Sequence, residues 1–63
     1  MKIDIKERFL RIREVVHRTG MSKATIYNRM NQGLFPKQIP TGANLVVWLE
    51  SDVQKWMQEQ IDK

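Results

Sequence analysis

The side chains between residues 22 and 32 include types that can form specific contacts with nucleic-acid bases. Asn can make a bidentate contact with adenine and Arg with guanine, while Thr can offer its hydroxyl or touch a thymine methyl group. Lys adds a charge that attracts phosphate. The side chains of these types in the segment include Lys23, Thr25, Asn28 and Arg29. Hydrogen bonding to base edges requires that one surface presents them together.

Two helices joined by a tight turn would form such a surface. Apolar residues repeat at spacings of three and four across residues 12–19, which favours a short helix over about 13–19. Gly20 suits the left-handed position after a helix. Ser22 is a strong N-cap candidate, and the second helix is expected over about 23–32. This spacing is that of a helix-turn-helix.

The second helix should separate into a buried face and an outward face. At about 100° per residue, Ile26 and Met30 fall on one side and are expected in the core. Thr25, Asn28 and Gln32 point away, as does the small Ala24, which allows close approach to a groove, and Tyr27 and Arg29 lie on opposite flanks. The backbone amides near Ser22 could bind a phosphate. No Asp or Glu occurs between Glu14 and Glu50, so nothing acidic would repel phosphate there.

Each of these side chains also has a purely structural explanation. Tyr27 could be a half-buried packing residue rather than a phosphate contact. Asn28 and Gln32 could be ordinary solvated positions, and the stem of Arg29 could cover the rim of the core. The hypothesis of DNA contact therefore rests on the combination of turn, cap, small residue and polar face.

The next segment predicts a β-hairpin. Two β-type runs, 38–40 and 45–48, flank a Gly-containing loop expected at 41–44. Pro40 cannot donate a backbone hydrogen bond, so its strand should be a short edge strand.

The hairpin strand that follows the loop should alternate between its two faces. If Val46 and Trp48 face inward, the period of two turns Leu45 and Val47 outward. Exposed apolar residues on a hairpin can mark a self-association surface.

A last helix completes the predicted fold. Ser51–Gln54 matches the capping-box pattern, and one apolar face follows it: Val53, Trp56, Met57 and Ile61. The fold class is therefore mostly α with a small β-hairpin, a winged helix-turn-helix of three helices plus a two-stranded wing. Residues 1–8 are predicted to be a flexible N-terminal arm, and 9–63 a single domain.

Composition narrows the classes of function. The 63 residues allow one small domain, and the absence of cysteine excludes disulfides and Cys-ligated zinc. With one histidine, scattered carboxylates and no Gly-rich phosphate loop, we expect no enzyme, metal, cofactor or small-molecule substrate. No apolar run could cross a membrane or serve as a signal peptide, so a cytoplasmic protein is expected.

The charge is unevenly distributed along the chain. The net charge is +4, but residues 1–40 carry nine basic and three acidic side chains, whereas residues 41–63 carry two basic and four acidic ones. A concentrated basic region attracts polyanions, of which nucleic acid is the usual one.

The chain resembles the AlpA family of phage and prophage regulators over roughly residues 9–62. The resemblance rests on five motifs: Leu10-x-Ile12-x-Glu14-Val15, Thr19-Gly-Met-Ser22, Thr25-Ile-Tyr27, Gly33-x-Phe35-Pro36-Lys37 and Val46-x-Trp48-x-Glu50-Ser51-x-Val53-x-x-Trp56. It implies a MerR-like winged helix related to phage excisionases, and a bacterial DNA-binding transcriptional regulator of a prophage or other mobile element. The recognition-helix motif of the family is matched here by Ser22, Thr25 and Tyr27. The family's basic residue before the wing is matched by Lys37.

From the residues and the resemblance together we expect double-stranded DNA as the partner, with helix 23–32 in the major groove and the hairpin on flanking DNA. Lys23 and Lys37 should attract phosphate, while Thr25, Asn28 and Arg29 should provide specificity. Similar proteins often carry an Arg in the wing turn, where this chain has Asn44. The full set of expected DNA-binding residues is Ser22, Lys23, Thr25, Tyr27, Asn28, Arg29, Lys37 and Asn44.

Two alternatives stay open at this point. An excisionase-like architectural factor would use the same surface to bend DNA for recombination. A protein-interaction module without DNA binding would use the outward apolar pair Leu45 and Val47, which could equally mediate self-association on DNA.

Overall fold

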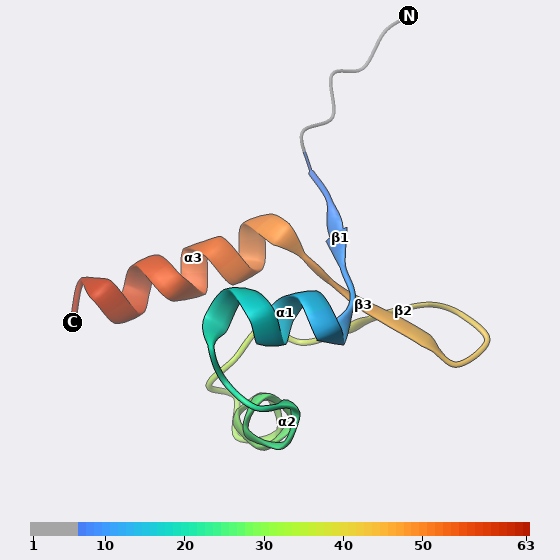
Figure 1. Cartoon of the computed structure of the whole chain (residues 1–63), viewed down its shortest axis with the longest axis horizontal. Helices are drawn as coiled ribbons and strands as arrows, with labels where there is room; N and C mark the ends of the chain where they lie inside the picture. The colour runs from blue at the N-terminus through green and yellow to red at the C-terminus, as the bar shows by residue number, and fades with distance from the viewer. Residues whose placement is uncertain (1–6) are drawn as a thin grey trace, which may run out of the picture.

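The computed structural model describes residues 7–63, and most of the expected N-terminal arm, residues 1–6, lies outside the described part. The elements follow in the order β1 (Phe9–Leu10), α1 (Ile12–Thr19), α2 (Lys23–Asn31), β2 (Ile39–Gly42), β3 (Leu45–Leu49) and α3 (Glu50–Ile61) (Figure 1). The three helices and the hairpin wing confirm the predicted winged-helix fold. The wing belongs to a three-stranded antiparallel sheet in the order β1-β3-β2, so β1 extends the expected two-stranded hairpin.

The turn between α1 and α2 has the predicted geometry. Gly20 adopts a left-handed conformation with φ 75°, and its N–H donates to the Val16 carbonyl at 2.9 Å. Ser22 has extended backbone angles, and its hydroxyl accepts the Thr25 backbone N–H at 3.2 Å. Because both helix ends are satisfied locally, this turn fixes where α2 begins.

The end of α2 is equally well defined. Gly33 is left-handed with φ 76°. Its N–H donates to the Met30 carbonyl at 3.1 Å, and the Leu34 N–H donates to the Arg29 carbonyl at 2.8 Å. This pair of bonds is the Schellman motif, which ends the helix and turns the chain back toward the sheet.

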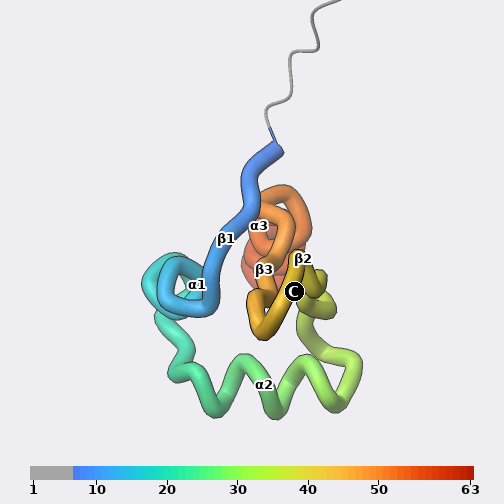
Figure 2. The backbone as a smooth tube through the Cα atoms, turned by 90° about the vertical axis from the view of Figure 1, so that its right-hand side faces the viewer, coloured from blue at the N-terminus to red at the C-terminus, as the bar shows by residue number. Residues whose placement is uncertain are grey.

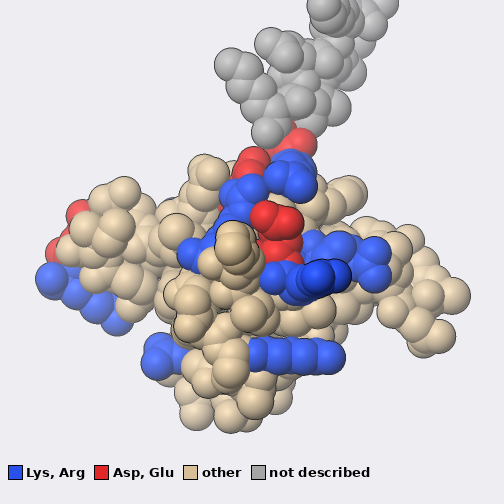
Figure 3. All heavy atoms as spheres, viewed as in Figure 1, with Lys and Arg blue, Asp and Glu red and all other residues tan. Residues whose placement is uncertain are grey.

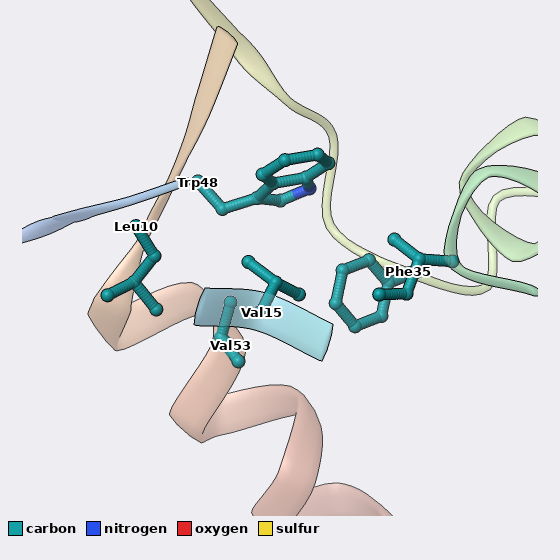
Figure 4. Close-up of a cluster of buried hydrophobic side chains, with 6 residues drawn as sticks. Leu10, Val15, Phe35, Trp48 and Val53 are labelled. Atoms are coloured by element: carbon teal, nitrogen blue, oxygen red, sulfur yellow. The ribbon is translucent and has the colours of Figure 1, made fainter. Parts of the chain in front are cut away.

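The core lies where the helices and the sheet meet. Its buried side chains are Leu10, Val15, Ile26, Phe35, Trp48 and Val53. Figure 4 shows the cluster, with all of these but Ile26 labelled. The Trp48 indole N–H also donates to the Pro36 carbonyl at 3.0 Å, and the Trp56 indole N–H donates to the Leu34 carbonyl at 2.8 Å. Two tryptophans thus hold the loop between α2 and β2 against the body of the protein.

The wing differs from the expected hairpin in its loop. The predicted four-residue loop at 41–44 is wrong, because Thr41 and Gly42 continue β2 and the turn itself contains only Ala43 and Asn44. The pairing shifts register between Pro40 and Gly42, so Thr41 is the extra residue of a bulge. The expected edge position of Pro40 is confirmed, since β2 pairs only with β3.

The expectation that Val47 is exposed is wrong. Its side chain is only 4% exposed, and Leu45 is half-buried. The period of two correctly separates Val47 from Trp48, but Val47 lies opposite Ile39 of β2 in the central strand β3 and is not left open to solvent. The pair Leu45 and Val47 is therefore not the exposed apolar surface on which the self-association and protein-interaction hypotheses depended.

The start of α3 also differs from prediction. The helix begins at Glu50, and the expected capping box is wrong because Ser51 lies inside the first turn. Instead, the Glu7 carboxylate accepts the Ser51 backbone N–H at 3.0 Å and its hydroxyl at 2.7 Å. The Arg8 carbonyl accepts the Glu50 N–H at 2.8 Å. The last two residues of the expected flexible arm therefore cap α3.

The far end of α3 extends beyond the core. Val53 is fully buried and Trp56 and Met57 pack partly against the core, as predicted. Ile61 does not share their environment, because it is 73% exposed. Among residues 7–63, no helix is both long and apolar enough to cross a lipid bilayer.

Candidate nucleic-acid interface

Helix α2 runs along one end of the molecule, below α1 and the sheet in Figure 2. Ile26 is fully buried and Met30 packs partly against the core, so these two residues attach the helix to the body. Lys23, Asn28 and Arg29 are exposed. At about 100° per residue, Asn28 lies opposite Ile26, and Lys23 and Arg29 lie on the two flanks of the helix. The periodicity therefore separates the two faces correctly, and three polar side chains are available on one helix.

A Ser22–Thr25 pair orders the first turn of α2. The Ser22 hydroxyl donates to the Thr25 hydroxyl oxygen at 2.9 Å while accepting the Thr25 N–H. In this arrangement the proton of the Thr25 hydroxyl is free to be donated to another acceptor. The serine is thus both the helix cap and the group that orients a candidate base-contacting side chain.

Tyr27 has a structural role that the residue pattern left open. Its ring packs edge-on against Trp48, with centroids 6.1 Å apart and an interplanar angle of 62°. The side chain is half-buried and contacts the core. The ring therefore sets the position of α2 against the sheet, and any contact with DNA has to come from its outer edge.

The remaining two candidates lie outside α2. Lys37 is exposed in the loop that the tryptophans hold, two residues before β2. Asn44 is exposed at the wing turn, with φ 61°. Asn is among the few non-glycine residues that adopt this left-handed conformation readily. Asn44 thus has a conformational reason to occupy the wing turn.

The acid-free segment is bounded by two carboxylates that share one partner. Arg18 Nη1 lies 2.6 Å from Glu50 Oε2, and Arg18 Nε lies 3.4 Å from Glu14 Oε2. The hydrogen bond to Glu50, aided by Glu14, raises the pKa of Arg18 above its ordinary value. Both carboxylates are therefore paired with the same guanidinium, whose charge offsets one of their two negative charges. Within the described residues, no cluster of three His, Asp or Glu side chains could hold a metal ion.

The capped turn, the exposed polar helix and the hairpin beside it define a protein of the winged helix-turn-helix class. The family described as "Prophage CP4-57 regulatory protein (AlpA)" matches residues 8–61. The chain belongs to this AlpA family, which confirms the resemblance seen in its motifs.

Two relatives show how far the similarity extends. The chain is 46% identical over 56 residues to "Uncharacterized protein ORF88" of Enterobacteria phage P4, covering 89% of this chain and 64% of that protein. It is 34% identical over 59 residues to "DNA-binding transcriptional activator AlpA" of Escherichia coli K12, covering 84% of each chain. The chain thus spans somewhat less than two thirds of the phage P4 protein and most of the E. coli protein.

Proposed function

We propose that this protein is a sequence-specific, double-stranded DNA-binding regulator of transcription in a prophage or mobile genetic element. The observation that carries the proposal is the exposed polar face of α2, free of acidic residues and held by the capped turn at Ser22. Membership of the AlpA family supports it, as does the name of the E. coli relative, a DNA-binding transcriptional activator. Such a protein acts on DNA in the bacterial cytoplasm.

In the proposed complex, α2 enters the major groove, which is wide enough to admit an α-helix. Asn28 and Arg29 contact base edges, and the Thr25 hydroxyl that Ser22 orients is a third base contact. Lys23, in the first turn, contacts phosphate. The small Ala24 leaves room for the helix to approach the bases.

The wing approaches the backbone or minor groove beside this site. Lys37 supplies phosphate attraction at its base, and Asn44 is the polar side chain at its tip. These contacts position the protein, whereas those of α2 provide sequence preference.

Selection from a random duplex library with the purified full chain tests this function. The proposal expects enrichment of a defined motif with a binding affinity that falls steeply as salt rises, because counterions are released from DNA. Absence of binding even at low salt would refute it.

An architectural role in recombination uses the same surface and needs its own measurement. A reporter strain with the promoter and the attachment site separates the two roles. If the protein regulates transcription, deletion of its gene should change promoter output even in a strain that lacks the cognate integrase. Unchanged output together with lost excision would favour the excisionase-like role.

A further inference from the structure

The wing carries no charge of its own. Residues 38–49 contain neither basic nor acidic side chains. In Figure 3 the wing is uncoloured on the face shown, whereas Lys and Arg gather over α1 and the foot of β1, and again beside α2. Phosphate attraction next to the wing must therefore come from another part of the molecule.

A surface hollow at the junction of β1 and α1 carries that charge. Its lining includes Arg8, Arg11, Arg13 and His17, and none of these is among the residues expected to bind DNA from the sequence. All four side chains are exposed. Three guanidinium groups thus gather at one corner of the molecule, within five residues of each other along the chain.

These three arginines are without acidic partners in the part of the chain that the structure describes. Glu14 is the one carboxylate that lines the hollow, and it is bound by Arg18, which also binds Glu50. No carboxylate of residues 7–63 lies within ion-pair distance of Arg8, Arg11 or Arg13. Among the described residues, no carboxylate therefore competes with an external anion for these charges.

The position of two of them is unfavourable for the helix itself. Arg11 is the N-cap residue of α1 and makes no side-chain capping bond, and Arg13 lies in the first turn. Positive side chains there oppose the positive end of the helix dipole. A residue choice that breaks a local stability rule is expected mainly where it serves binding.

We propose that Arg8, Arg11 and Arg13 form a second phosphate-binding surface for the duplex whose major groove α2 enters. This inference rests on the proposed function. In the sheet order β1-β3-β2, the arginine surface adjoins β1 while Lys37 precedes β2. The two basic regions therefore flank the uncharged hairpin from opposite sides. A guanidinium group can bind phosphate through two parallel hydrogen bonds, so the surface replaces the charge that the wing lacks.

The test compares two double variants that lose the same charge. Arg11→Gln with Arg13→Gln removes two charges from the proposed surface. The control, called the α3 variant, is Lys55→Gln with Lys63→Gln, which removes one exposed charge from α3 and one just beyond its end. Affinity for the duplex enriched by the wild-type protein is measured by fluorescence anisotropy at several salt concentrations. Thermal unfolding of both variants serves as the folding control. The loss of Arg11 and Arg13 removes positive charge from the positive end of the α1 dipole, so the arginine variant should stay folded.

Two lost phosphate contacts should make the slope of log affinity against log salt shallower by about 1.8. Between about 50 and 200 mM salt, the factor by which affinity falls should then be roughly twelvefold smaller for the arginine variant than for the wild type. Its base preference should be unchanged. The α3 variant should keep the wild-type slope.

Equal slopes for the two double variants would overturn the inference and leave the proposed function intact. A changed base preference of the arginine variant would have the same two consequences. A wild-type protein that binds no duplex at the lowest salt would overturn both.

Discussion

Three substitutions of Ser22 can separate its contribution to the stability of the fold from its contribution to the proposed DNA contact. Its hydroxyl accepts the Thr25 N–H at 3.2 Å and donates to the Thr25 hydroxyl at 2.9 Å, and both groups lie near solvent. In Ser22→Ala, water can reach the released N–H, so the loss is that of a typical N-cap, about 1 kcal/mol. For a domain of this size, this corresponds to a fall in Tm of about 4–8 °C.

The companion variants keep the cap and change the charge. Ser22→Asn and Ser22→Asp both retain a side-chain oxygen that can accept the N–H, so their Tm should stay close to that of the wild type. Ser22→Asp also places a negative charge where phosphate is proposed to lie. Repulsion over about 4 Å in water costs about 1 kcal/mol, so affinity for DNA should fall roughly fivefold relative to Ser22→Asn.

Calorimetry and fluorescence anisotropy on the same preparations measure the two effects. An unchanged Tm for Ser22→Ala would refute the capping argument. Equal affinities of Ser22→Asp and Ser22→Asn would show that no phosphate approaches the start of α2.

Three further predictions follow from single contacts. Asn28→Ala should relax base preference at one position of the selected motif, whereas Lys37→Ala should weaken all sequences alike and reduce the salt slope by about 1; identical profiles in a library selection would contradict this division. Asn44→Gly should keep the left-handed turn, whereas Asn44→Ala should cost about 1 kcal/mol of the free energy of unfolding; equal stability of the two in urea would show that the φ of 61° carries no strain. The hydrogen bonds from the Ser51 N–H and hydroxyl lower the pKa of Glu7. Glu7 therefore stabilises the fold above its ordinary pKa of 4.5, and this contribution is lost as the pH falls through the lowered value. Glu7→Gln should remove that part of the acid dependence of unfolding, and an unaltered pH profile would contradict this prediction.

The parts of the fold that short-range chemistry determines were predictable from the sequence. Gly20, Ser22 and Gly33 set helix ends through contacts within four residues, and the structure has those ends where the pattern indicates. The buried face of α2 follows from helical periodicity alone, as Ile26 shows. These features fix the presentation of α2, and with it most of the candidate site.

Contacts between residues far apart in the sequence were not predictable in this way. The bond between Glu7 and Ser51 joins residues 44 positions apart, and it replaces a local capping box that the sequence favoured. Strand β1 has only two residues, too few for a periodic signal, yet it makes β3 a central strand. The arginine surface depends on the same junction of β1 and α1, which explains why residue types alone did not identify it.

A backbone amide NMR titration with the selected duplex shows whether DNA binds to the exposed face of α2. We predict that the largest shift changes occur at residues 22–29, with smaller changes at Lys37 and near Arg11. Residues of α3 after Trp56 should remain unaffected. Changes confined to α3, with α2 unperturbed at saturating DNA, would show that α2 is not the DNA-binding surface.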